Sequence, residues 1–132
     1  MLGVPKMSDK RILLVDDEEI ILDTYSSLLS EKGYYVATAC SGSEALAKCF
    51  KQPFDLIITD LAMMNGDGLT VLEEIKAKSP HTQVIILTGT RSKVMSEFVS
   101  RLGAYALIEK PCSNEFFLSC IKDALMKART LL

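Results

Sequence analysis

The sequence predicts an α/β fold of the doubly wound class, in which a parallel sheet of five strands is flanked by five helices. Short apolar runs alternate along the 132-residue chain with segments of helical period, the pattern of repeated strand–helix units. The runs at residues 12–15, 56–58 and 84–87 are continuous and too short for helices, as expected of strands covered on both faces. Polar residues with reactive groups stand directly after these runs.

The other strands and the helices follow from composition and period. Residues 35–39 and 104–108 are apolar but mixed with small or polar residues, which favours strands nearer the edges of the sheet. Helical spacing places each of the following sets on one helix face: Ile21, Tyr25, Leu28 and Leu29; Ala45, Leu46, Cys49 and Phe50; Leu69, Leu72 and Ile75; Val94, Phe98 and Leu102; and Phe117, Cys120, Ile121, Ala124, Leu125 and Ala128.

Capping signals agree with these helices. Ser41 and Glu44 have the spacing of a capping box, and Ser113 is expected to cap the last helix. Gly33 stands where the first helix should end, because glycine readily adopts the left-handed conformation that closes a helix. Alternating strands and helices imply right-handed crossovers and a parallel sheet with helices on both faces.

Composition limits the class of function. We expect residues 10–132 to form one domain, and residues 1–9, which lack periodicity, to be a loosely ordered extension. The net charge of −2 argues against nucleic-acid binding, because neutralising phosphates requires a basic face. No apolar run approaches the roughly 20 residues of a membrane span. The four cysteines show no metal-binding spacing, which indicates reduced thiols in the cytoplasm.

Five polar residues stand where predicted strands end: Asp16, Asp17, Asp60, Thr88 and Lys110. Parallel strands end along one edge of their sheet, and open α/β folds carry their sites there. Any one of these residues alone is more often a helix cap or a solvated group than part of a site. Their joint placement at the ends of four strands is what indicates chemistry.

Four strings of sequence carry a resemblance to a known family: Leu14-Val15-Asp16-Asp17-Glu18, Asp60-Leu61-Ala62-Met63-Met64-Asn65-Gly66-Asp67-Gly68, Leu87-Thr88-Gly89, and Gly103-Ala104 followed by Lys110-Pro111. They resemble the receiver domain of two-component response regulators, of the chemotaxis-receiver type, over nearly the whole chain. The resemblance implies a flavodoxin-like sheet with strand order 2-1-3-4-5. It also implies a cis peptide bond between Lys110 and Pro111.

That strand order makes the first and third strands neighbours, about 4.8 Å apart, so Asp16, Asp17 and Asp60 should crowd into one pocket. Two like charges about 4 Å apart repel by roughly 4 kcal/mol at an effective dielectric constant of about 20, which favours a bound cation. Few protein oxygens with room for water describe Mg²⁺ better than Ca²⁺. By resemblance, Mg²⁺ (or Mn²⁺) is bound by Asp17, Asp60 and the backbone carbonyl of Ala62, with Asp16 close by or acting through water.

The resemblance also assigns the chemical roles. Asp60 is the phosphoacceptor, and a histidine kinase or a phosphotransfer protein is the donor. Lys110 and the hydroxyl of Thr88 bind oxygens of the phosphoryl group, and Thr88 also belongs to the switch. Gly89 lets the backbone approach the phosphoryl group closely.

Two positions depart from the family pattern. Met64 occupies a place where receivers usually have proline, so the loop after Asp60 should be less rigid. Leu107, three residues before Lys110, replaces the aromatic residue that usually reports phosphorylation. Tyr105 lies two residues earlier and, by the period of a strand, on the same side as Leu107, which makes it a candidate substitute. The alternative is that Tyr105 merely packs with its hydroxyl at the surface.

The implied function is a signalling module that promotes its own phosphorylation and dephosphorylation without being a turnover enzyme. Phosphorylation is expected to change the surface formed by residues 91–102, Tyr105 and the C-terminal helix. A homodimer through this surface is one candidate output. Neither nucleic acid nor a membrane is an expected partner of this domain.

Two alternatives belong to other classes of function. A small magnesium-dependent phosphohydrolase would also use an aspartyl nucleophile, but its pattern has a second aspartate two residues later, where this chain has Ala62. A receiver fold could also serve as an unphosphorylated binding module, although all five functional positions are filled. The chain has neither the phosphate-binding pattern G-x-x-x-x-G-K-[ST] nor the dinucleotide pattern G-x-G-x-x-G, so its phosphate must come from another molecule.

Overall fold

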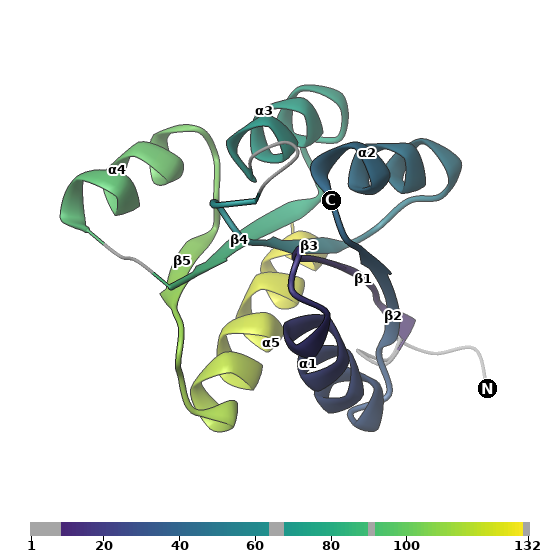
Figure 1. The fold of residues 1–132 in the computed structure, drawn as a ribbon. Helices are drawn as coiled ribbons and strands as arrows, with labels where there is room; N and C mark the ends of the chain where they lie inside the picture. Colours follow the sequence, from purple (N-terminus) through teal and green to yellow (C-terminus); the bar gives the residue numbers. More distant parts are fainter. Residues whose placement is uncertain (1–8, 64–67, 90–91, 131–132) are drawn as a thin grey trace.

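Five parallel strands form one sheet in the order β2-β1-β3-β4-β5 (Figure 1). The structure is a computed structural model and describes residues 9–63, 68–89 and 92–130. Helices and strands alternate as β1 Arg11–Val15, α1 Glu19–Glu31, β2 Tyr35–Ala39, α2 Gly42–Lys51, β3 Leu56–Thr59, α3 Gly68–Lys78, β4 Gln83–Thr88, α4 Lys93–Arg101, β5 Ala106–Glu109 and α5 Asn114–Thr130. The predicted fold class, strand order and edge positions of β2 and β5 are confirmed.

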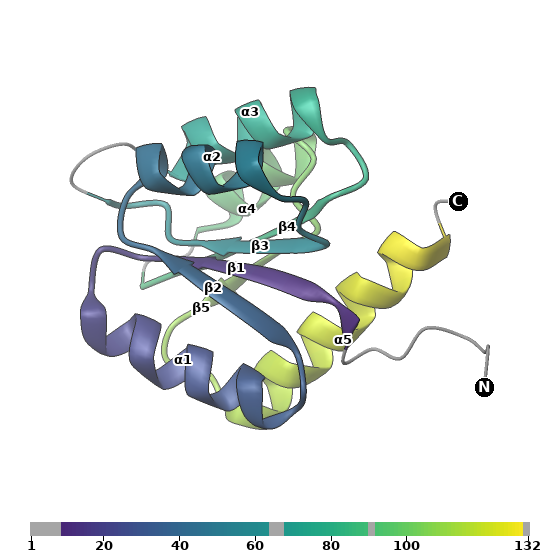
Figure 2. The same cartoon turned by 90° about the vertical axis from the view of Figure 1, so that its right-hand side faces the viewer.

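The sheet separates two layers of helices. Helices α1 and α5 cover one face, and α2, α3 and α4 cover the other (Figure 2). Alternation along β1 divides its side chains between the two cores, so that Ile12 and Leu14 face α1 and α5 while Leu13 and Val15 face the other layer. The side chains of β1, β3 and β4 are buried on both faces apart from Arg11, which explains their continuous apolar runs.

The predicted helix ends are confirmed. Ser41 accepts a hydrogen bond from the backbone N–H of Glu44 at 3.1 Å, and the Glu44 carboxylate accepts from the N–H of Cys40, one residue before the cap. Ser113 accepts from the N–H of Phe116 at 3.0 Å. Helix α1 ends at Glu31, and Gly33 has φ +91°. These bonds satisfy backbone N–H donors at or next to the helix starts, which would otherwise be left open.

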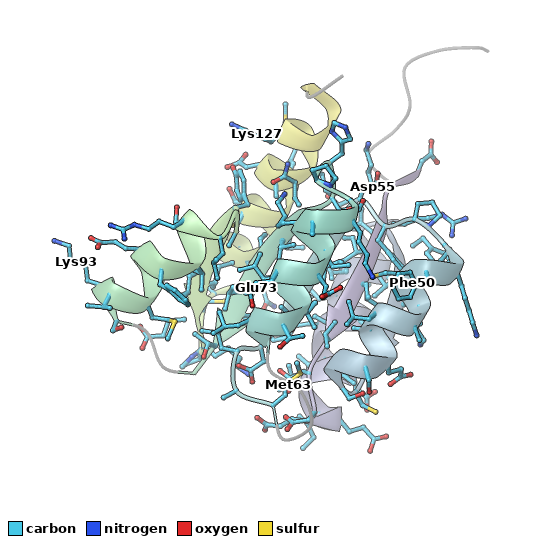
Figure 3. All side chains as sticks on the ribbon, turned by 90° about the horizontal axis from the view of Figure 1, so that it is seen from above. Phe50, Asp55, Met63, Glu73, Lys93 and Lys127 are labelled. Atoms are coloured by element: carbon cyan, nitrogen blue, oxygen red, sulfur yellow. The ribbon has the colours of Figure 1, made fainter. Side chains whose placement is uncertain are left out.

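One predicted helix face, one residue of a second face and one strand boundary are wrong. Val94 and Phe98 are 77% and 45% exposed, because α4 instead buries the neighbouring stripe that contains Val99. Phe50 lies on α2 (Figure 3). It is 66% exposed, and the ammonium of Lys78 lies 4.4 Å from the centre of its ring. The predicted face of α2 is otherwise confirmed, because Ala45, Leu46 and Cys49 pack in or against the core. The predicted strand at residues 104–108 is displaced, since β5 begins at Ala106 and runs to Glu109.

Lys76 of α3 forms hydrogen bonds at the edge of the sheet where the strands begin, opposite their carboxyl ends. Its ammonium donates hydrogen bonds to the carbonyls of Pro80 and Thr82, both at 3.0 Å. Its methylene groups lie against Gly103, where a Cβ would meet Lys76 Cε at 3.0 Å. Gly103 has φ +105°, which side chains other than glycine rarely adopt. Within the described part of the chain, no helix is long and apolar enough to cross a membrane.

Replacing Gly103 with alanine should therefore lower the free energy of unfolding by roughly 1 to 3 kcal/mol, because the residue is forced to keep a positive φ. Gly89→Ala is the matched control, since a Cβ there meets no described atom within 4 Å and φ is not positive. Its cost should stay within about 0.5 kcal/mol. Urea unfolding measures both variants, and equal losses would contradict the role given to the Gly103 backbone.

Candidate functional site

The carboxyl ends of the strands bring the predicted residues together. Asp16 directly follows β1, Asp60 directly follows β3, and Lys110 directly follows β5. Val15 pairs with Thr59, so the two aspartates leave neighbouring strands side by side. The N–H of Asp60 donates to the carbonyl of Val15 at 3.2 Å, which continues the sheet bonding one step beyond β3.

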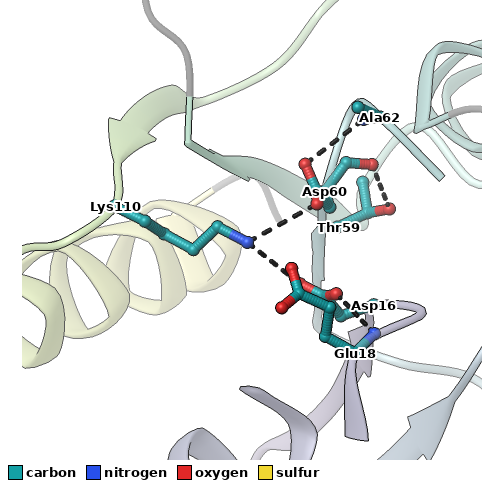
Figure 4. A network of polar contacts seen from close by, with 6 residues as sticks. All are labelled: Asp16, Glu18, Thr59, Asp60, Ala62 and Lys110. Carbon is teal, nitrogen blue, oxygen red and sulfur yellow. Dashed lines mark hydrogen bonds and ion pairs between the residues drawn. The ribbon is translucent and has the colours of Figure 1, made fainter. Parts of the chain in front are cut away.

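One ammonium faces two buried carboxylates (Figure 4). Lys110 Nζ lies 3.2 Å from Asp16 Oδ2 and 3.5 Å from Asp60 Oδ2. Asp16 is 1% exposed and Asp60 is 6% exposed. Burial by itself lowers the pKa of Lys110, but the two carboxylates outweigh it, so the pKa of the ammonium lies above its ordinary value. Lys110 is therefore charged, and its charge is shared between two partners.

Backbone donors orient both carboxylates. The N–H of Glu18 donates to Asp16 Oδ1 at 2.9 Å, and the N–H of Ala62 donates to Asp60 Oδ1 at 3.2 Å (Figure 4). Each aspartate thus accepts from the chain two residues ahead through one oxygen and faces Lys110 through the other. This arrangement presents the Oδ2 atoms on the same side of the pocket.

The third carboxylate makes the pocket negative. Asp17 is exposed, and one oxygen from each of Asp16, Asp17 and Asp60 lies within 4.8 Å of the others. Among the described residues of the pocket, three carboxylates face the one ammonium of Lys110, which leaves an excess of two negative charges. Each pair of carboxylates repels by roughly 3 to 4 kcal/mol at an effective dielectric constant of about 20. Clustered hard oxygen donors of this kind fit Mg²⁺ or Mn²⁺.

Thr88 is the last residue of β4 and is joined to the lysine through the sheet. It is buried, pairs with Glu109 of β5, and its carbonyl accepts from the N–H of Lys110 at 2.7 Å. The peptide bond between Lys110 and Pro111 is cis, as predicted. Among the described residues, packing does not require glycine at position 89. The close approach of the Gly89 backbone to a phosphoryl group therefore stays a prediction. The role of the Ala62 carbonyl as a metal ligand also stays a prediction.

Leu107 and Tyr105, the switch candidates besides Thr88, differ in environment. Leu107 is buried with Val99 of α4, whereas Tyr105 is 36% exposed. Both line a cavity of about 110 Å³ between α4 and β5, together with Ala106 between them, so their placement on one side stays a prediction. Burial, followed by the nearby Asp123 and Cys120 of α5, raises the pKa of the Tyr105 hydroxyl. Tyr105 therefore lies at the edge strand between α4 and α5.

Sequence reasoning gave no role to Thr59 and Gly68, yet both lie against the main-chain carbonyl of Asp60. The Thr59 hydroxyl donates to that carbonyl at 3.1 Å, and a Cβ on Gly68 would lie 2.1 Å from its oxygen. The available signal was a glycine at the first position of a helix, where it lowers helix propensity. Met64 and residue 91, which the sequence singled out, lie outside the described residues.

The sequence matches a known family and longer regulators. A family model described as the response regulator receiver domain matches residues 12–122. The alginate biosynthesis transcriptional regulatory protein AlgB of Pseudomonas aeruginosa is 40% identical over 105 residues, which cover 80% of this chain and 23% of AlgB. The transcriptional regulatory protein GlrR of Escherichia coli is 35% identical over 114 residues, which cover 86% of this chain and 26% of GlrR. The chain thus spans about a quarter of the length of these curated relatives.

Solved structures agree in fold over most of the chain. A CheY-like response regulator receiver domain protein from Methanospirillum hungatei has a TM-score of 0.89 at 34% identity, covering 93% of this chain and 98% of that protein. The solution structure of the beryllofluoride-activated NtrC4 receiver domain dimer has a TM-score of 0.86 at 40% identity, covering 91% of this chain and 99% of that one. Both solved structures are thus similar to this chain in sequence and in fold.

Changing Lys110 to methionine should lower the free energy of unfolding by about 3 kcal/mol in the presence of EDTA, because it leaves two buried carboxylates without a counter-charge. Asp60→Asn removes one of the competing carboxylates and keeps the Asp16–Lys110 pair, so its cost should stay below about 1 kcal/mol. Urea unfolding at neutral pH checks both. A Lys110→Met variant no less stable than Asp60→Asn would contradict the shared ion pair.

Proposed function

Because the chain belongs to the response regulator receiver domain family, we propose that it accepts a phosphoryl group on Asp60 from a phosphohistidine of a histidine kinase or a phosphotransfer protein. The observation that carries this proposal is the pair of contacts from Lys110 to Asp16 and Asp60, which gathers three strand ends into one pocket. That pocket holds a carboxylate nucleophile beside an ammonium that can bind the transferred group.

The transfer needs one bond to form and one to break. A carboxylate oxygen of Asp60 attacks phosphorus, and the P–N bond to the donor imidazole breaks with its electron pair left on the ring nitrogen. The Ala62 N–H bond to Oδ1 holds the carboxylate plane during the attack. Lys110, already 3.5 Å from Asp60, turns to an oxygen of the incoming group, and the Thr88 hydroxyl donates to another.

The acidic cluster would hold Mg²⁺ or Mn²⁺ through Asp17, Asp60 and the carbonyl of Ala62, with Asp16 in contact or acting through water. When bound, the cation neutralises charge on the transferring phosphoryl group. The residues themselves supply the selectivity, because oxygen donors spaced within 4.8 Å of one another suit a hard cation.

The phosphohydrolase alternative finds no support in this pocket. Its second acid would have to stand two residues after Asp60, where Ala62 offers a methyl group that cannot donate a proton. The comparisons give no support to an unphosphorylated binding module either. The four cysteines are free thiols, in keeping with our placement of the chain in the reducing cytoplasm.

The surface formed by α4, β5 and α5 is the proposed output. Val94 and Phe98 of α4 and Tyr105, directly before β5, are large apolar or aromatic side chains that are exposed on these elements. The NtrC4 receiver domain, similar in sequence and fold, is a dimer in its beryllofluoride-activated form. We therefore extend the proposal to a homodimer through this surface, with Tyr105 in place of the usual switch aromatic. Neither nucleic acid nor a membrane is proposed as a partner of this domain.

Incubation with Mg²⁺ and acetyl phosphate should add one phosphoryl group to the wild-type protein and none to Asp60→Asn, because the nucleophile is lost. Intact-mass spectrometry measures the addition. Asp23→Asn on the exposed side of α1 is the matched control and should be phosphorylated like the wild type. Removal of Mg²⁺ with EDTA should reduce uptake at least about 100-fold. Uptake retained in Asp60→Asn would identify another acceptor.

Tyr105→Ala should accept phosphate at the wild-type rate but lose phosphorylation-dependent dimerisation, since the exposed ring lies at the opposite end of β5 from Lys110 and belongs to the proposed interface. Sedimentation velocity with and without acetyl phosphate measures the change. The matched control is Tyr35→Ala on β2, at the opposite edge of the sheet. If both variants dimerise like the wild type, Tyr105 is not part of the output.

A further inference from the structure

The carbonyl group of Asp60 is the point where helix α3 meets the end of β3. A Cβ built on Gly68 would lie 2.1 Å from the Asp60 carbonyl oxygen, 2.9 Å from its carbonyl carbon and 3.0 Å from Leu61 Cα. Contacts shorter than 3.0 Å do not occur between a real Cβ and backbone atoms, so no other residue fits without moving one of these segments. Gly68 also donates its N–H to the Leu61 carbonyl at 3.1 Å.

A second group holds the same carbonyl from the strand side. The hydroxyl of Thr59, the last residue of β3, donates to the Asp60 carbonyl oxygen at 3.1 Å. Thr59 is fully buried and pairs with Val15 and Ile86 in the sheet. The peptide group that follows Asp60 is therefore fixed between the sheet and the first residue of α3.

The position of this peptide group affects the orientation of the Asp60 carboxylate. It joins Asp60 to Leu61, and the next peptide group carries the N–H of Ala62, which donates to Asp60 Oδ1 at 3.2 Å. We propose that Gly68 is a positioning residue for phosphoryl transfer, because its missing side chain lets α3 rest on the Asp60 carbonyl and so fixes the carboxylate that attacks phosphorus. The inference rests on the proposed function of Asp60 and adds a residue eight positions away that touches no reacting atom.

The expected size of the effect follows from geometry. A methyl group at Gly68 must retreat by about 1 Å from the Asp60 oxygen to reach even the shortest contact that proteins tolerate. Misplacement of a reacting group by about 1 Å can cost as much as 100-fold in rate. Gly68→Ala should therefore slow phosphorylation by acetyl phosphate roughly 10- to 100-fold at saturating Mg²⁺.

A purely structural role for Gly68 would lower stability without this loss of rate. Gly103→Ala is the matched control, because it strains a glycine far from the strand ends and should keep the wild-type rate constant. Both variants are assayed by intact mass at a temperature at which circular dichroism shows each to be folded. A Gly68→Ala rate within about twofold of Gly103→Ala would overturn the proposal.

A second pair of variants decides the matter if Gly68→Ala does not fold. Thr59→Val removes the hydroxyl donor at nearly constant volume and should slow phosphorylation roughly 3- to 10-fold, while Thr59→Ser keeps the donor and should restore most of the rate. Equal rates for the two variants would overturn the proposal.

A spectroscopic readout separates this inference from the proposed function. The amide proton of Ala62 reports its hydrogen bond to Asp60 Oδ1 without any phosphoryl donor, and it should move upfield in Gly68→Ala or Thr59→Val but not in Gly103→Ala. A wild-type protein that takes up no phosphate would overturn the proposed function and the catalytic part of this inference together. An unchanged Ala62 signal in folded Gly68→Ala, with wild-type uptake intact, would overturn the positioning role alone.

Discussion

The ammonium of Lys110 lies between two buried carboxylates, and the other site residues lie around this unequal number of opposite charges. Asp16 and Asp60 meet because β1 and β3 pair directly, and Lys110 reaches them from β5 across β4. Among the described residues, the fold thus brings three carboxylates close to the one ammonium of Lys110, which leaves the pocket with an excess of negative charge. We expect a bound divalent cation to stabilise such a pocket and, by neutralising charge, to allow a phosphoryl group to approach.

Strand β5 connects this pocket to the outer surface. Lys110 follows β5 directly, and Leu107 on the same strand packs with Val99 of α4. A shift of Lys110 from the aspartates toward a phosphoryl oxygen would displace the end of β5, the strand that packs against α4. Tyr105 stands at the start of this strand, between α4 and α5, where a small cavity leaves room for side-chain rearrangement. Packed contacts of this kind can exist in two discrete arrangements.

Much of the fold and the pocket could be predicted from the sequence, because buried strands are continuous apolar runs and their polar ends mark one edge of a parallel sheet. The side of α4 that faces the sheet could not, since stripes through Phe98 and Val99 are both apolar and only tertiary packing selects between them. The contact of Gly68 with the Asp60 carbonyl was also hidden, because a missing Cβ leaves no pattern in the sequence beyond the glycine itself. Both failures concern packing between elements.

The most direct test of the charge imbalance is the dependence of the free energy of unfolding on Mg²⁺ concentration, measured by urea titration at constant ionic strength. A native pocket that binds the ion should make the protein more stable by about 1.4 kcal/mol for each tenfold rise in Mg²⁺ above the dissociation constant. A free energy of unfolding that does not change with Mg²⁺ concentration would contradict the claim that the excess negative charge of Asp16, Asp17 and Asp60 binds a divalent cation.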